Sequence, residues 1–98
     1  MIIRFVKMVF QPEKVDQFEE LFRERKDEIM DSEGCISVEL LRIKHAKDST
    51  GVVYFTRSKW NNEDDLLAYR SSELFADTWQ RTKVLFADKP DAWTLEIV

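Results

Sequence analysis

The sequence holds few of the residues with which small proteins stabilise a fold covalently or through a metal. Cysteine and histidine each occur once among the 98 residues, as Cys35 and His45. One cysteine cannot form an internal disulfide, and these two side chains fall short of the about four ligands that structural zinc requires. A domain of this size buries only about 60 to 65% of the surface that its unfolded chain exposes. We therefore expect a partner subunit to supply further stability.

Positive charge, long apolar runs and flexible residues are also scarce. The 15 Lys and Arg residues against 19 Asp and Glu give a net charge of −4, which argues against a nucleic-acid surface. No stretch approaches the about 20 apolar residues of a membrane span. The opening residues 1–10 carry Arg4 and Lys7 and are typical of a strand rather than a signal peptide. With two glycines and two prolines, the chain is expected to form one domain of regular structure over residues 1–98. We expect it in the cytoplasm, without nucleic-acid or membrane partners.

The spacing of apolar residues predicts alternating strands and helices. Strands are expected at 2–10, 35–43, 52–60 and 92–98, where β-branched and aromatic residues dominate. A helix is expected from Pro12 to about residue 30, with its apolar side chains three and four residues apart, and Gly34 follows it. A second helical segment begins at Asn61-Asn62, has another start at Ser71-Ser72-Glu73, continues through Phe86 and ends at Pro90.

The resulting β-α-β-β-α-β order predicts a ferredoxin-like α+β fold, with a four-stranded antiparallel sheet and two helices on one face. Both faces of the first strand are apolar. Ile3, Phe5 and Val9 lie on one face, while Ile2, Val6, Met8 and Phe10 lie on the other. Two helices cover only one of these faces, so we expect a homodimer in which the uncovered sheet faces meet.

Several stretches resemble one known family. "EGC" at 33–35, "KW" at 59–60, "NNEDDLLAYRSSELFADTW" after it and "KPDAWTLEIV" at 89–98 are similar to the antibiotic biosynthesis monooxygenase domain family, whose members are small dimeric α+β barrels. The resemblance covers nearly the whole chain. It implies a shape more firmly than a reaction, because the family includes cofactor-independent monooxygenases, haem-degrading enzymes and an isomerase of a small signalling molecule.

The haem-degrading members differ from this chain at two positions. Where they have a histidine ligand this chain has Trp79, whose indole offers only an N–H donor, and where they have an asparagine it has Lys7. His45 falls in the loop between two strands, where we expect a solvated side chain. We therefore expect no haem, no other cofactor and no metal.

The cofactor-independent oxygenases in the family imply a pocket with aromatic walls and few polar groups. The resemblance makes Tyr69 and Trp60 the candidate catalytic residues. The candidate substrate-binding residues are Phe75, Trp79, Lys7 and Arg57.

Each candidate also has a purely structural interpretation. Trp60 and Trp79 are equally typical of a packed core, and Lys7 and Arg57 can extend from apolar strands to water. Cys35 has no neighbouring base in the sequence, so we expect a small buried residue and not a nucleophile.

The function predicted from these residues is oxidation of a small aromatic, quinol or enolisable substrate by O₂ without metal or flavin. Two alternatives stay open. One is an isomerase of a small metabolite in the same pocket, and the other is a non-catalytic dimer that binds a small molecule or has a structural role. A cavity with at least two inward polar groups favours a ligand-dependent function, whereas a solid interior favours the structural one.

Overall fold

The computed structural model describes residues 1–44 and 51–98 of the chain, so His45 lies outside the described residues. The elements in chain order are β1 (Ile2–Phe10), the 3-10 turn η1 (Pro12–Lys14), α1 (Val15–Met30), β2 (Cys35–Arg42), β3 (Val52–Trp60), α2 (Glu63–Arg70), α3 (Glu73–Lys83) and β4 (Phe86–Glu96). None of the helices in the described ranges is long and apolar enough to cross a membrane.

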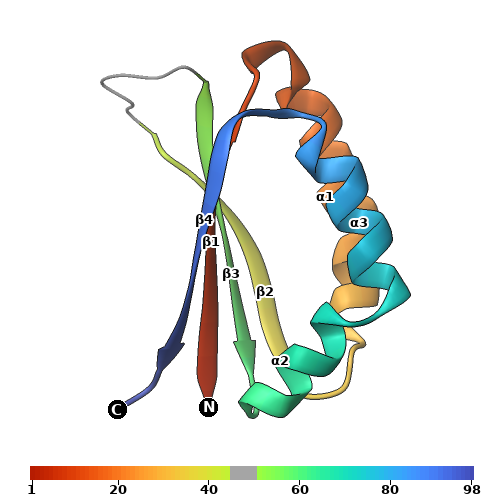
Figure 1. The fold of residues 1–98 in the computed structure, drawn as a ribbon, viewed down its shortest axis with the longest axis vertical. Coiled ribbons are helices and arrows are strands. Elements are labelled where there is room, and N and C mark those ends of the chain that lie inside the picture. Colours follow the sequence, from red (N-terminus) through yellow and green to blue (C-terminus); the bar gives the residue numbers. More distant parts are fainter. Residues whose placement is uncertain (45–50) are drawn as a thin grey trace.

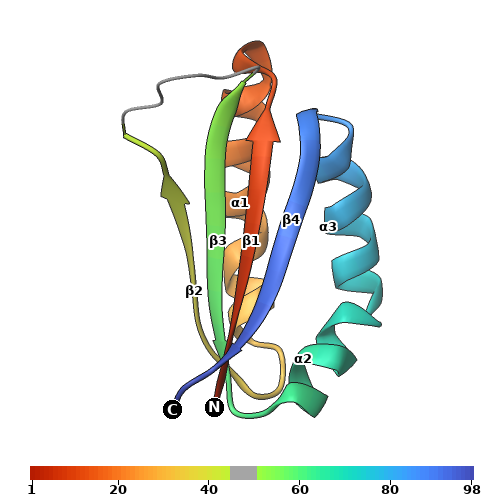
Figure 2. The ribbon, with the colours of Figure 1, turned by 60° about the vertical axis from the view of Figure 1, so that its left-hand side comes forward.

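The four strands form one antiparallel sheet in the order β2-β3-β1-β4 (Figure 2). β1 is central and pairs with β3 from Ile2↔Trp60 to Phe10↔Val52. The long helices α1 and α3 lie together on one side of the sheet, and α2 sits at the end of the sheet near both termini (Figure 1). The ferredoxin-like arrangement predicted from the element order is confirmed, with the second helical segment divided in two.

The last strand begins six residues earlier than the sequence pattern predicts. α3 ends at Lys83, and Phe86 is the first residue of β4, paired with Phe10. The prediction that the helix runs through Phe86 to Pro90 is therefore wrong. Its spacing was misleading because Phe86 packs against Trp79 from the strand, with ring centroids 5.6 Å apart. Pro90 is tolerated in β4 because it lies where the β1–β4 register shifts, between Lys7 and Val9.

Two side-chain caps set the boundaries of α2 and α3, as the sequence predicts. The Asn62 side chain accepts a hydrogen bond from the Asp65 N–H at 2.9 Å and starts α2. The Ser72 hydroxyl accepts one from the Phe75 N–H at 3.1 Å and donates to the Tyr69 carbonyl at 2.6 Å. One hydroxyl therefore closes the end of α2 and opens α3, which fixes the angle between them.

Gly34 connects α1 to β2 in the left-handed conformation that the sequence predicts. Its φ is +79°, and a Cβ built there would lie 2.1 Å from a carboxylate oxygen of Asp65 in α2. Its carbonyl also accepts a hydrogen bond from the Asn61 N–H at 2.9 Å. The turn before β2 therefore packs directly against the first turn of α2, and both the conformation and the close approach require glycine.

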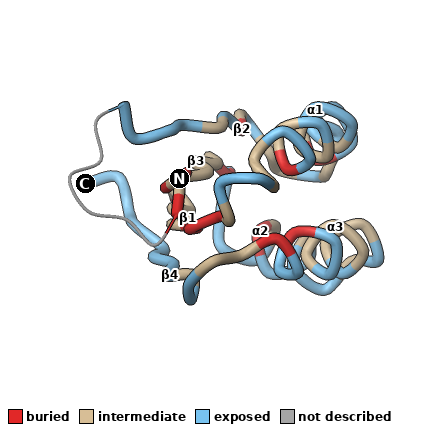
Figure 3. The backbone as a smooth tube through the Cα atoms, turned by 90° about the horizontal axis from the view of Figure 1, so that it is seen from above, coloured by how far each residue is buried: buried red, intermediate tan, exposed pale blue. Residues whose placement is uncertain are grey.

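The buried residues form two separate groups rather than one continuous core. Figure 3 shows buried positions on β1 and on the helices, whereas much of β4 is exposed. The first core cluster contains Met8, Phe10, Phe18, Tyr54 and Leu85. The second core cluster contains Ile2, Trp60 and Leu66, with Cys35 and Tyr69 packed against it. Both clusters lie between the sheet and the helices. No described element forms a layer over the opposite face of the sheet (Figure 1).

Replacing Ser72 with alanine is expected to lower the free energy of unfolding by about 0.5–2 kcal/mol, because the Phe75 N–H loses its cap. Urea titration followed by circular dichroism measures the change. Ser71→Ala is the matched control. Its hydroxyl donates to the Leu67 carbonyl, which also accepts the Ser71 N–H, so no backbone group loses its only partner and the effect should stay within about 0.5 kcal/mol. Equal losses in the two variants would contradict the role of Ser72.

Candidate functional site

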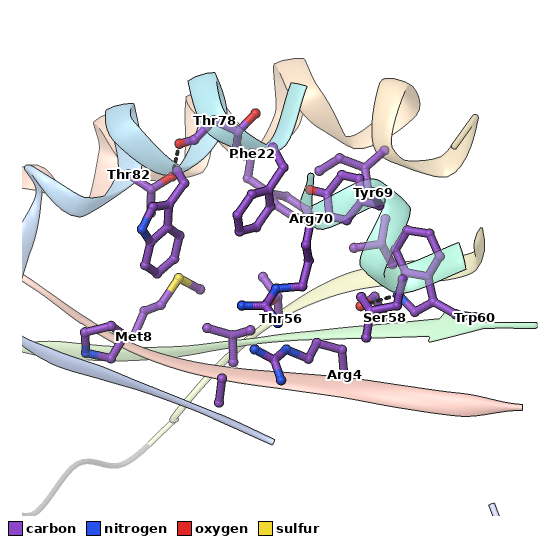
Figure 4. A pocket seen from close by; sticks show the side chains of 18 of the residues that line it. Arg4, Met8, Phe22, Thr56, Ser58, Trp60, Tyr69, Arg70, Thr78 and Thr82 are labelled. Carbon is purple, nitrogen blue, oxygen red and sulfur yellow. Dashed lines mark hydrogen bonds between the residues drawn. The ribbon is translucent and has the colours of Figure 1, made fainter. Parts of the chain in front are cut away.

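A cavity of about 340 Å³ lies between the sheet and the helices (Figure 4). Its walls include Met8 and Phe18 from the first core cluster and Trp60 and Leu66 from the second, so the cavity separates the two clusters. Its volume is in the range of small-molecule sites, about 300–1,000 Å³. The interior is therefore hollow where a purely structural domain would be packed.

The four predicted aromatic residues come together along this cavity. Trp60 stacks on Tyr69 with centroids 5.1 Å apart, and Tyr69 meets the edge of Phe75 at 5.4 Å. Phe75 in turn lies 6.1 Å from Trp79 with nearly parallel planes. This aromatic row, defined as Trp60, Tyr69, Phe75 and Trp79, runs from the end of β3 along α2 and α3. The spacing in the sequence brings the rings together because the break at Ser71 turns α3 back over the sheet.

Tyr69 is held in its protonated form. Burial raises the pKa of Tyr69 to about 12, with a smaller contribution from Cys35. A phenol with this pKa is neutral at physiological pH, so it can donate a hydrogen bond but is not present as a phenolate base. Trp60 is fully buried, and its indole N–H donates to the Ser58 hydroxyl at 2.9 Å, which fixes the ring at the end of the cavity.

Two arginines that are not among the candidates predicted from the sequence also line the cavity. Arg4 extends from β1, where its guanidinium donates to the Thr94 hydroxyl at 2.9 Å. Arg70 ends α2 and lies 6.0 Å from the ring centre of Phe75. The pKa of Arg4 is lowered, first by burial and then by the charge of Arg70. Asp91 is the one acidic residue among those that line the cavity in the described part of the chain; it is exposed, and its pairing with Lys7 places its side chain on the opposite face of the sheet.

Lys7 and Arg57 do not line the cavity. Lys7 follows Val6 and precedes Met8, which both line it, so its side chain leaves the opposite face of the sheet. Arg57 likewise stands between Thr56 and Ser58 and forms an ion pair with Glu39 at 3.0 Å on the outer face. Lys7 and Arg57 are therefore not placed to contact a substrate in this cavity.

A signal for Arg4 is present in the sequence, because it shares the even-numbered face of β1 with Val6 and Met8. Arg70 carries no comparable signal. It lies at the exposed end of a short helix, and only the direction of that helix brings it over the cavity.

Thr78 and Thr82 give the α3 side of the cavity some polar character. The Thr82 hydroxyl donates to the Thr78 carbonyl at 2.7 Å. The Thr78 hydroxyl is buried and has no hydrogen-bond partner among the described residues. Unpaired buried hydroxyls are uncommon in folded proteins, so the Thr78 hydroxyl is available to a ligand in the cavity.

Cys35 lies beside Tyr69 at the entry of β2 and is partly buried. Burial raises the pKa of its thiol, partly offset by the hydrogen bond that the thiol donates to the Ser37 carbonyl. A raised pKa disfavours the thiolate, which agrees with the expectation that Cys35 is not a nucleophile. Within residues 1–44 and 51–98, no three His, Cys, Asp or Glu side chains come together in a way that could hold a metal.

Solved structures with similar folds come from several bacteria. A candidate antibiotic biosynthesis monooxygenase from Caulobacter crescentus has 21% identity and a TM-score of 0.88, covering 99% of this chain and 89% of that one. One from Bordetella bronchiseptica has 22% identity and a TM-score of 0.84, covering 99% and 96%. One from Nitrosomonas europaea has 13% identity and a TM-score of 0.85, covering 100% and 99%. At these identities the likeness establishes the fold alone.

The fold and the cavity together define a ferredoxin-like α+β domain with a hollow interior of small-molecule size. Residues 1–81 match the antibiotic biosynthesis monooxygenase family. The chain therefore belongs to that family, as the sequence resemblance predicts. No curated protein matches the chain.

The raised pKa of Tyr69 predicts a measurable loss of stability at high pH. An unfolded tyrosine ionises near pH 10 and the folded Tyr69 near 12, so the folded state holds more protons between these values. The free energy of unfolding should fall as the pH rises from about 10 to about 12, by up to about 1.4 kcal/mol per pH unit from this group. Chemical denaturation across this range measures it.

Tyr69→Phe should remove that part of the pH dependence and leave the contribution of Tyr54, whose pKa is also raised by burial. Absorbance at the phenolate band follows the same ionisation directly. If Tyr69 ionised near pH 10 in the folded protein, that result would contradict the burial of its side chain.

Proposed function

We propose that the protein is a monooxygenase that oxidises a small electron-rich aromatic, quinol or enolisable compound with O₂ and without metal or flavin. The observation that supports this most directly is the aromatic row along a cavity of about 340 Å³, in which the neutral Tyr69 lies between Trp60 and Phe75. Aromatic walls hold a flat substrate and limit its contact with water. Membership of the antibiotic biosynthesis monooxygenase family agrees with this reading.

In the proposed reaction the substrate itself supplies the electrons. Its hydroxyl loses a proton to solvent, and the resulting anion transfers one electron to O₂, which gives a substrate radical and superoxide. The two radicals join through a new C–O bond, and the peroxide takes up a proton. Cleavage of the O–O bond with loss of the C–H proton then leaves a carbonyl and releases water. One oxygen atom enters the product, the other enters water, and O₂ receives four electrons.

The residues of the aromatic row would hold and orient the substrate. Tyr69 would donate a hydrogen bond to a substrate oxygen, because its phenol stays protonated. Trp60, fixed by Ser58, supports the Tyr69 ring from behind. The same cavity offers less to an isomerase, because proton transfer within a substrate requires a base and the carboxylate of Asp91 is exposed. A purely structural role is disfavoured by the cavity itself.

Oxygen consumption with a panel of naphthols, anthrones and quinols tests the proposed reaction. Tyr69→Phe should lower kcat/KM about 2- to 13-fold, because it removes one hydrogen bond worth about 0.5–1.5 kcal/mol. Trp60→Phe should also lower it by loosening the support of Tyr69. Tyr54→Phe is the matched control, since Tyr54 lies in the first core cluster and its hydroxyl donates to Glu19. Absence of uptake across the panel would refute the oxygenase.

We further propose that the protein is a homodimer through the open face of the sheet. Residues paired across strands share a face, so Ile3 with Leu95 and Phe5 with Trp93 lie on the side away from the helices. Trp93 is 45% and Leu95 44% exposed. Phe5 also meets the edge of Phe55, with centroids 6.3 Å apart. A contiguous apolar face of this kind is typical of an interface rather than of a free surface.

Sedimentation velocity at micromolar concentration tests the dimer. The wild-type chain should sediment at about twice its mass of 11.7 kDa, and Phe5→Glu should shift it to the monomer, because the interface would bury an unpaired charge. Val84→Glu is the control, since Val84 is 67% exposed beyond the end of α3, on the helix side of the molecule. A wild-type monomer would refute the proposed interface.

A further inference from the structure

The two cationic side chains in the cavity occupy the same part of it. Arg4 reaches in from the sheet and Arg70 from the helix layer, and Figure 4 shows their guanidinium groups converging beside Thr56. They come from opposite walls of the cavity and lie 66 residues apart in the sequence (positions 4 and 70). Neither β1 nor α2 alone determines where the guanidinium group of its arginine lies. Their convergence therefore results from how α2 is set over β1.

Neither guanidinium is neutralised by a carboxylate in the described part of the chain. Among residues 1–44 and 51–98, no carboxylate forms an ion pair with Arg4 or Arg70. Other arginines of the chain do have such partners: Arg25 with Asp77 at 2.7 Å, Arg57 with Glu39 at 3.0 Å, and Arg81 with Asp77 at 3.1 Å.

The contacts that Arg4 and Arg70 do make leave their charge available. Arg4 gives one hydrogen bond to Thr94, and Arg70 lies against the ring of Phe75. A guanidinium has five N–H donors, so most of the donors remain free. These contacts orient both groups without compensating them. Burial lowers the pKa of Arg4 most, and the charge of Arg70 lowers it further. Two like charges facing one cavity disfavour each other unless an anion lies between them.

We propose that Arg4 and Arg70 form a binding subsite for the carboxylate of the ligand, and that the ligand is an aromatic acid. A carboxylate is planar and accepts paired hydrogen bonds from guanidinium groups, which favours it over a single phenolate oxygen. The aromatic part has apolar surface on both sides, because Phe22 on the helix side and Met8 on the sheet side border the same cavity (Figure 4). The identification of this acid as a substrate rests on the proposed function, whereas its binding does not.

Isothermal titration calorimetry with two probes of equal size tests the subsite. The probes are 2-naphthoate, which carries the carboxylate, and 2-naphthamide, which is its neutral counterpart. The wild-type protein should bind the carboxylate about 10- to 100-fold more tightly, as expected for hydrogen bonds to charged groups. Added salt should weaken naphthoate binding and leave naphthamide binding nearly unchanged, because salt screens the charge interaction.

Substitution of either arginine should remove this preference. Arg70→Met and Arg4→Met should each weaken naphthoate binding about tenfold or more and change naphthamide binding much less. Arg70 is exposed, so its variant tests the subsite even if Arg4→Met affects folding. Arg70→Lys keeps the charge but loses the paired geometry, and should restore part of the affinity. Arg23→Met is the charge-matched control, because Arg23 pairs with Glu20 on the exposed surface of α1.

The outcomes separate this proposal from the oxygenase. Equal affinities for the two probes, or no binding of 2-naphthoate, would overturn the anion subsite even if oxygen is consumed. Loss of affinity in the Arg23→Met variant equal to that in Arg70→Met would overturn it as well. Arginine-dependent binding of naphthoate without any oxygen consumption would support the subsite and refute the oxygenase.

Discussion

The alternation of side chains along β1 is the constraint on which the rest of the structure depends. β1 is the central strand, paired on both edges, so its register fixes which residues meet the helices. Its even-numbered side chains, including Val6 and Met8, build the core wall and place Arg4 among them. Its odd-numbered side chains, including Ile3 and Phe5, form the opposite apolar face. A slip by one residue would exchange the two faces and remove both the cavity and its charge.

The interruption between α2 and α3 converts this wall into a cavity. A continuous helix after β3 would leave the sheet in one direction, whereas the Ser72 cap permits a change of direction and lets α3 return along the sheet. α2 places Tyr69 on Trp60 at one end, and α3 places Trp79 near the first core cluster at the other. The helices therefore bridge two packed regions without filling the space between them.

Most of the fold could be predicted because the strands and caps rest on local signals. β2, β3 and both starts in the second helical segment follow from residue type and spacing. β4 was placed too late because Phe86 continues the spacing of α3 while belonging to the next strand. The four aromatic residues named from the sequence as pocket walls line the cavity, whereas Lys7 and Arg57, the candidates for substrate binding, lie on the other face of the sheet. Both faces of β1 are apolar, so the pattern alone does not say which one meets the helices, and Arg70 depends on tertiary geometry that no local pattern encodes.

Gly34 has an influence that reaches beyond its own turn. It lies outside the cavity, yet any side chain there would collide with Asp65 and push the first turn of α2 away from the sheet. α2 is a short rigid rod that ends in Tyr69 and Arg70, so such a push at one end would be transmitted to the other. The absence of a side chain at Gly34 thus lets α2 approach the turn before β2 closely. A residue that does not line the cavity therefore influences where Tyr69 and Arg70 lie.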